Sequence, residues 1–236
     1  MRIIAAMAAF LLGAMALPAK AQQGQFQTAT PLQVIELFTS QACPFSDISD
    51  KNLAKFADNE DLLALTYPVT YWNYTGWQDT MGQKIFDQRQ SVYNQRLGSG
   101  WLSTPQMIIN GRMAIKGDDP AMIEQALAEA AISPAPVKIA REDRTIMIRL
   151  MDSNLVPKLV LYAPGPISVA ITSGKNAGRT LSYVNVVKAL HAMEEQDDHY
   201  AITLSEEEAS LACAILLENR NSGEIASAMR CNAVKS

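Results

Sequence analysis

The chain has 236 residues, and its 20 lysine and arginine side chains against 24 aspartates and glutamates give a formal net charge of −4 at pH 7. Removing the first 21 residues also removes Arg2 and Lys20, so 18 basic and 24 acidic side chains remain and the net charge becomes −6. No cluster of lysine and arginine offers the basic face that binds nucleic-acid phosphates or anionic lipid, so we expect neither partner. The 215 residues after position 21 predict one large domain or two small ones.

Residues 1–21 predict a cleavable signal peptide. Arg2 precedes the uncharged run 3–17, and Pro18 closes that run before an Ala-x-Ala motif that ends at Ala21 and suits signal peptidase. The run has 15 residues, whereas a membrane-spanning helix needs about 20. We therefore expect a periplasmic or secreted protein that begins at Gln22 and has no membrane association after cleavage.

Strand-like and helix-like patterns alternate between residues 30 and 132. They predict strands at 32–39 and 61–70, helices at 47–59, 82–97 and 120–131, and a hairpin of strands 106–109 and 113–115. The hairpin surrounds Asn110-Gly111, the strongest short signal for a hairpin turn. The order strand, helix, strand, helix, hairpin, helix implies an α/β domain with a mixed sheet covered by helices.

The segment Ser133-Pro134-Ala135-Pro136 interrupts this pattern, because two prolines in three residues disfavour both a helix and a central strand. Strands separated by turns follow it, at 145–151, 158–163, 167–171, 209–217 and 224–231. Residues 184–193 fit either a helix or a long strand. The pattern predicts a smaller, mostly antiparallel β domain at 137–236, with a sandwich as one form that it can take.

Two of the three cysteines, Cys213 and Cys231, lie in the last predicted hairpin. Residues that face each other across its turn should have numbers that add up to about 442 to 444, and 213 and 231 add up to 444. An exported protein can keep a disulfide here, worth about 3 kcal/mol of stability in the chain-entropy model. The alternative is a pair of buried thiols.

The third cysteine, Cys43, follows the first predicted strand and comes just before the predicted helix at 47–59. Free N–H groups and the dipole at a helix N-terminus stabilise a thiolate, so this placement indicates a nucleophile. Ser46 completes a Cys-x-x-Ser motif, where its hydroxyl can hydrogen-bond the thiolate or cap the helix but cannot release a mixed disulfide. The alternative is a buried structural cysteine beside a capping serine.

Other chemistries have weaker support. The histidines, His191 and His199, both follow residue 137, so a cysteine hydrolase would need a site between the domains. No group of cysteines and histidines has the spacing of metal ligands, and we expect neither a metal nor another cofactor. Ser40 three residues before Cys43 matches the Ser/Thr-x-x-Cys of peroxiredoxins, although Glu36 replaces the expected proline; reduction of peroxide at Cys43 stays open.

Five aromatic side chains gather around the segment between the second predicted strand and the hairpin. Core and loop packing is the simpler interpretation, and an aromatic rim that holds a peptide near the third cysteine is the alternative. The residues are Tyr71, Trp72, Tyr74, Trp77 and Trp101.

Several separated segments resemble one family in the same order. They are ELFTSQAC (36–43), YWNYTGWQD (71–79) and STPQMIINGR (103–112), followed by GKNAGRTL (174–181) and VNVV (184–187). These segments resemble the DUF1223 family of secreted thioredoxin-like proteins, and they extend over nearly all of the chain after position 30.

This resemblance implies a thioredoxin-like fold for residues 30–132, with Cys43 at the active-site helix. It also implies that Thr104-Pro105 forms a cis-proline loop that faces Cys43 and offers main-chain hydrogen bonds to a peptide substrate. Besides Thr104 and Pro105, the substrate-binding residues expected on this basis are Pro44, Phe45 and Trp72.

The chain departs from the family at two motifs. The family's Cys-x-x-Cys is Cys-x-x-Ser at 43–46, and its His-Val-Asp-Tyr-Trp is Pro-Val-Thr-Tyr-Trp at 68–72. A resolving thiol, an imidazole and a carboxylate are therefore missing, which disfavours ordinary dithiol turnover. We expect thiol–disulfide exchange or capture of a client as a mixed disulfide at Cys43, with protein or peptide thiols or glutathione as partners. The alternative is a non-catalytic binding or structural protein with a degenerate redox site.

Overall fold

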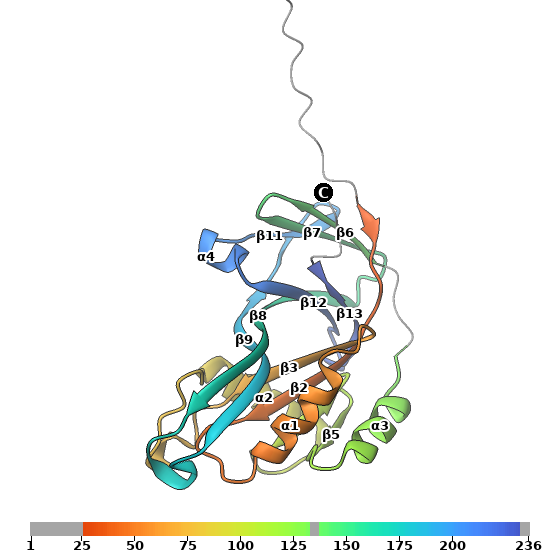
Figure 1. Ribbon diagram of the computed structural model, residues 1–236. Coiled ribbons are helices and arrows are strands. Elements are labelled where there is room, and N and C mark those ends of the chain that lie inside the picture. The colour runs from red at the N-terminus through yellow and green to blue at the C-terminus, as the bar shows by residue number, and fades with distance from the viewer. Residues whose placement is uncertain (1–25, 133–136, 232–236) are drawn as a thin grey trace, which may run out of the picture.

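The computed structural model describes residues 26–132 and 137–231 (Figure 1). The predicted signal peptide and the proline segment at 133–136 lie outside these residues. Within them, no helix combines the length and apolar character needed to cross a membrane. The described residues form a mixed α/β structure with two sheets.

The larger sheet has eight strands. In spatial order they are β13 (Ile225–Arg230), β12 (Ala212–Asn219), β8 (Leu155–Ala170), β9 (Thr180–Ala192), β3 (Leu62–Pro68), β2 (Gln33–Thr39), β4 (Gln106–Ile109) and β5 (Met113–Ile115). The smaller sheet has five: β1 (Gln27–Thr28), β6 (Val137–Glu142), β7 (Thr145–Leu150), β11 (His199–Thr203) and β10 (Glu194–Gln196).

Helices cover both faces of the β2–β5 part of the larger sheet. They are α1 (Asp47–Phe56), α2 (Lys84–Leu97) and α3 (Pro120–Glu129). Alternate side chains of β2 point to opposite faces, so its apolar run is buried on both. One face packs under α2 through Val34, Phe38, Phe86 and Tyr93, and the other packs under α1 and α3 through Ile35, Leu37, Leu53 and Ile123. The strands and helices predicted up to residue 132 are confirmed, with ends that shift by up to three residues.

Strands from beyond residue 137 extend this sheet. Strand β9 pairs in parallel with β3 at Thr66 and Val186, and the Thr66 hydroxyl donates to the carbonyl of Val184 (2.6 Å). Asn185 adds a bond from its side-chain amide to the carbonyl of Ala64 (3.0 Å). The segment at 184–193, which fitted a helix or a strand, therefore lies almost entirely within a strand, and the eight-stranded sheet includes strands from both sides of the proline segment (Figure 1).

The strands predicted at 158–163 and 167–171 form one long strand, β8. The pairing of β8 with β9 shifts between Ala163 and Pro166, where Gly165 has a positive φ of 75°. A bulge of this kind bends a strand without ending its pairing. Pro164 and Gly165 therefore lie at an irregularity inside one strand and not in a loop between two strands.

The smaller sheet packs against the larger one through a second apolar core. Its members come from β6 and β7 on one side and from β8, β12 and β13 on the other: Val137, Ile139, Ile146, Ile148, Leu159, Leu161, Ile215 and Met229. The sequence suggested a sandwich made by residues 137–236, whereas the two packed sheets include strands from both sides of the proline segment. Short helices complete the fold: η1 (Asn73–Thr75), η2 (Gly174–Asn176) and α4 (Glu206–Ala209).

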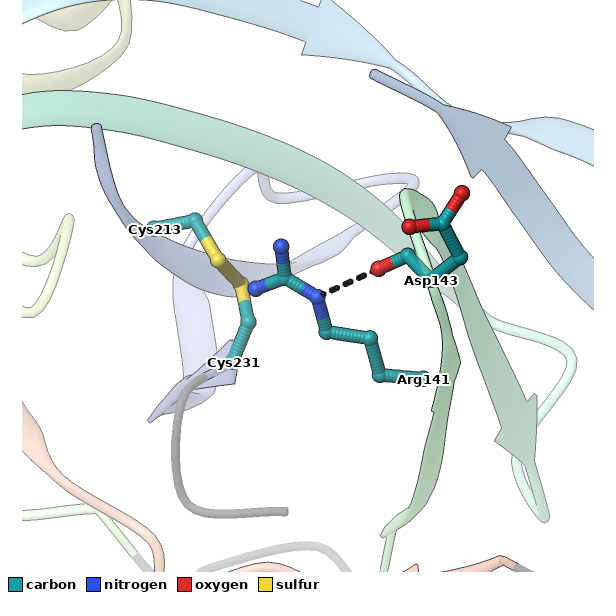
Figure 2. The surroundings of a disulfide bond; sticks show 4 residues. All are labelled: Arg141, Asp143, Cys213 and Cys231. Atoms are coloured by element: carbon teal, nitrogen blue, oxygen red, sulfur yellow. Dashed lines mark hydrogen bonds between the residues drawn. A yellow bond between two sulfur atoms is a disulfide. The ribbon is translucent and has the colours of Figure 1, made fainter. Parts of the chain in front are cut away.

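A disulfide joins Cys213 and Cys231 at the edge of this second core, as the hairpin register predicts (Figure 2). The two Cα atoms are 5.4 Å apart, and the neighbouring pair Ala214 and Arg230 is directly opposite in the β12–β13 ladder. Figure 2 also shows Arg141 of β6, whose Nε donates to the carbonyl of Asp143 (3.0 Å). The disulfide fixes Cys231, the last described residue, to the sheet.

Candidate functional site

Cys43 lies in a turn that follows the carboxyl end of β2. Its main-chain N–H donates to the carbonyl of Ser40 (3.0 Å), and α1 begins only at Asp47. The first helical amides belong to the next turn, where Ser49 and Asp50 donate to the carbonyl of Ser46. Stabilisation by a helix dipole falls off within about one turn. The geometry thus gives little support to the expectation that the helix N-terminus stabilises a Cys43 thiolate.

The bond between Thr104 and Pro105 is cis, and this loop faces Cys43. The Cys43 Sγ donates to the carbonyl of Thr104 across 3.5 Å. The predicted contact between these two segments, 61 residues apart in the sequence, is therefore confirmed.

The Cys43 thiol is buried: the residue is 1% exposed. The sequence left a nucleophile and a buried structural cysteine both open, and in the structure loops from distant parts of the chain hold the 40–43 turn. The Asp79 carboxylate accepts from the main-chain N–H of Gln41 (2.8 Å). The side-chain amide of Asn176 donates to the carbonyls of Gln41 (2.8 Å) and Cys43 (3.0 Å).

Sequence reasoning missed Asn176 and Asp79 as residues of this site. Asn176 ends η2, and Asp79 comes two residues after Trp77, whose indole donates to the Gln41 side chain (2.8 Å). Both residues lie inside segments that resemble the family, which is the signal that could have found them. Burial raises the pKa of Asp79 even though main-chain donors at Gln41 and Met81 act in the opposite direction.

Ser46 fills neither of the roles predicted for it. Its side chain is buried, makes no capping hydrogen bond at the start of α1, and its Oγ has no hydrogen-bond partner among the described residues. Nearby in α1, Asp50 is also buried, and one of its oxygens accepts from the Thr39 hydroxyl (3.0 Å). Burial raises the pKa of Asp50 well above its ordinary value.

The residues expected to bind substrate differ in exposure. Thr104 and Pro105 are buried, Pro44 and Trp72 are half-buried, and Phe45 is 64% exposed. The ring of Trp72 has the Lys175 ammonium 5.9 Å from its centroid.

Two further apolar side chains near the cis-proline loop are open to solvent. Trp101 is 91% exposed and Leu102 is 41% exposed. Leu102 precedes Thr104 by two residues and Phe45 follows Cys43 by two, so exposed apolar side chains lie on both chain segments that meet at the thiol.

The two histidines lie outside this site. His191 pairs with Glu208 (2.7 Å) and His199 with Asp198 (2.9 Å), both after residue 137. In residues 26–132 and 137–231, no three side chains of the metal-ligating types come together. The contact that Cys43 makes through its sulfur is with a main-chain carbonyl and not with an imidazole.

Fold and site together define a two-sheet α/β protein with one buried thiol opposite a cis-proline. The chain belongs to the family described as "Protein of unknown function (DUF1223)", which matches residues 34–218. The X-ray crystal structure of protein AGR_C_4864 from Agrobacterium tumefaciens is similar, with 28% identity, a TM-score of 0.67, and coverage of 84% of this chain and 92% of that one.

A second solved structure, HBP35 of Porphyromonas gingivalis, is 12% identical and has a TM-score of 0.54, with 88% of this chain and 76% of that one covered. At this identity the likeness concerns the fold alone. The search of curated proteins gives no match.

Proposed function

We propose that this protein is an exported binding protein built on a degenerate thioredoxin-like redox site, and that it holds an extended polypeptide segment at the cis-proline loop. The burial of the Cys43 thiol, at 1% exposure and donating to the Thr104 carbonyl, carries this proposal. A sulfur in this position offers no surface to a client disulfide, and buried structural cysteines are unreactive.

The strand arrangement supports the thioredoxin-like part of the proposal. Strands β9, β3 and β2 are parallel, β4 and β5 form an antiparallel hairpin beside them, and helices cover both faces. The cysteine follows the central strand β2, and the cis-proline precedes β4. These features match what the family resemblance implies.

Export is supported by two observations. The first 21 residues have the pattern of a signal peptide, and the disulfide between Cys213 and Cys231 is of a kind that persists in oxidising compartments such as the periplasm.

Exposed apolar side chains around the Cys43–Thr104 contact, here called the rim, support polypeptide binding. Phe45, Trp101 and Leu102 lie within a few residues of the Cys43–Thr104 contact, and large aromatic side chains contribute most to many protein interfaces. Their surface stays in contact with water unless a partner covers it, which favours a segment with apolar side chains.

Binding can be measured with a fluorescein-labelled, carboxymethylated polypeptide that stays unfolded. Phe45→Ser and Trp101→Ser should each weaken its affinity by at least about tenfold, the loss expected for an aromatic anchor. Met151→Ser is the control, because Met151 is a 74% exposed apolar residue that follows β7 in the smaller sheet and lies outside both segments that meet at Cys43. Equal affinities in all three variants would rule out the rim as the binding surface.

Thiol exchange is the second candidate, and the contact of Cys43 with the cis-proline loop favours it. In this reaction the Cys43 thiol loses its proton to water and its sulfur attacks one sulfur of a client disulfide. A mixed disulfide forms, and the second client sulfur leaves as a thiolate. The turn at 40–46 would have to open first.

Iodoacetamide distinguishes the two candidates. If the site is degenerate, Cys43 should stay unmodified in the native, oxidised protein and react completely in urea, and Cys43→Ala should take up no label. Rapid modification of the native protein, together with a glutathione adduct on Cys43 after treatment with oxidised glutathione, would establish exchange and displace the binding-protein assignment.

A further inference from the structure

A groove beside α2 shares no lining residue with the Cys43 site. Its volume is about 450 Å³, within the range of about 300 to 1,000 Å³ that small-molecule sites occupy. One wall is a face of α2, and the other comes from β8, β9, β12 and the turn after β12.

The α2 wall carries an apolar strip that the protein itself leaves uncovered. Four large apolar residues of this helix divide between two faces: Ile85, Phe86, Val92 and Tyr93. Phe86 and Tyr93 are buried in the core, whereas Ile85 is 44% exposed and Val92 is 52% exposed, and both line the groove. Their spacing of seven residues corresponds to two turns, about 10 Å along the helix. Leu190 of β9 lines the opposite wall.

Two cations in the groove are already neutralised. Arg89 is 2.8 Å from the buried carboxylate of Glu36 and 2.8 Å from that of Glu218. Lys158 binds the other oxygen of Glu218, also at 2.8 Å. Two positive and two negative charges cancel in this cluster.

Two more basic side chains lie at the edges of the groove. His191 is 2.7 Å from a carboxylate oxygen of Glu208, and Arg220 is 3.5 Å from one of Glu195. Each therefore has a carboxylate of its own nearby.

Arg96 differs from these cations. Within residues 26–132 and 137–231 it has no carboxylate in ion-pair range, and its buried Nε has no hydrogen-bond partner. The guanidinium is nevertheless fixed: Nη2 donates to the Gly111 carbonyl (3.1 Å), and the group lies 5.4 Å from the centroid of the Tyr93 ring. A Cβ on Gly223, whose φ is +61°, would lie 2.5 Å from Arg96 Nη1, so the glycine leaves room for the guanidinium.

We propose that this groove binds a small monocarboxylate with an apolar body, of the medium-chain fatty-acid type. The carboxylate lies on Arg96, because a planar guanidinium presents parallel N–H donors that match the two oxygens of a carboxylate. The apolar body covers Ile85 and Val92. One uncompensated positive charge beside an apolar strip selects a ligand that carries one negative charge at one end.

Titration calorimetry with decanoate tests the site. The protein should bind one equivalent saturably, and decanol and decyltrimethylammonium, which share the chain but not the charge, should bind at least about tenfold more weakly. Arg96→Gln should weaken decanoate binding by about tenfold or more for the same reason. Lys84→Gln is the matched control: it removes the same charge from the same helix, but Lys84 is 80% exposed and outside the groove.

A second pair of variants distinguishes a specific loss of binding from a loss caused by unfolding. Val92→Asp places a carboxylate four residues before Arg96, where the two side chains can pair along the helix, so the protein supplies its own anion. This variant should keep its thermal stability and lose decanoate binding. Val92→Asn removes the same apolar contact without adding a charge, so it should bind decanoate at least about tenfold more tightly than Val92→Asp does. Absence of saturable decanoate binding, equal binding of decanol, or unchanged affinity in Arg96→Gln and Val92→Asp would each overturn the proposal.

Discussion

Asp50 is buried in the first turn of α1, and this burial raises the pKa of its carboxyl well above the ordinary value. Above about pH 4 the unfolded chain releases the Asp50 proton while the folded protein keeps it, so the free energy of unfolding falls as pH rises. Asp50→Asn removes this pH-dependent loss of stability, and the oxygen of the asparagine side chain can still accept from the Thr39 hydroxyl. The difference in unfolding free energy between variant and parent should grow by about 1.4 kcal/mol per pH unit, until the pH reaches the folded pKa. Urea unfolding of both proteins at a series of pH values measures this difference.

Asp118 offers a control of opposite sign. Its carboxylate is 2.8 Å from the Lys116 ammonium, and this hydrogen bond lowers the pKa of Asp118. The stability it contributes is present above its unfolded pKa and is lost as pH falls, so Asp118→Asn should become less stable than the parent as pH rises. If both variants showed the same pH trend, the explanation from Asp50 burial would be wrong.

Helix α2 is fastened to the sheet by Arg89, which bridges Glu36 of β2 and Glu218 of β12. Burial raises the pKa of Glu218, but Arg89 and Lys158 outweigh this and bring it below its ordinary value. Arg89→Met would leave the carboxylate of Glu36 buried without its cation. Breaking such a pair costs about 3 to 5 kcal/mol, so we expect a loss of that size in the free energy of unfolding, measured with urea.

The Arg89 prediction has its own control and rescue. Lys84→Met on the same helix breaks only an exposed pair with Asp87 and should cost less than about 1 kcal/mol. Adding Glu36→Gln and Glu218→Gln to Arg89→Met should recover much of the stability, because no unpaired charge then stays buried. A loss below about 1 kcal/mol for Arg89→Met alone would show that the bridge contributes only as an exposed pair does.

The elements that the sequence predicts are those with a strong local signal. The buried run of β2, the Asn110-Gly111 turn and the register of the last hairpin each depend on a few neighbouring residues. Most of the smaller sheet escaped prediction: β1 has two residues, and β10 is Glu-Glu-Gln with every side chain exposed, so neither carries an apolar pattern. The sequence left the burial of Cys43 open, since the turn that carries it is held by Asn176, 133 residues further along the chain.

The two halves of the molecule are interlocked through the sheet and through the site. Strand β9 lies beside β3, and Asn176 holds the turn that carries Cys43. The core under α2 likewise contains Val160, Val187 and Leu216 from beyond residue 137. A site assembled in this way keeps its geometry only while both halves are present, so the cis-proline loop and the turn at Cys43 depend on strands that follow them by more than 50 residues.

A fragment of residues 26–132 is therefore expected not to fold by itself. Without β9, strand β3 loses its neighbour on one side, and the removed strands expose the apolar core that they share with β2 and β3. The fragment should give a gradual urea transition and a poorly dispersed amide spectrum, and adding a fragment of residues 137–231 should restore both a cooperative transition and protection of Cys43 from iodoacetamide. A sharp transition and protected Cys43 in the first fragment alone would mean that residues 30–132 form an independent domain, as the sequence pattern predicts, and that the shared sheet is only a contact between two folded units.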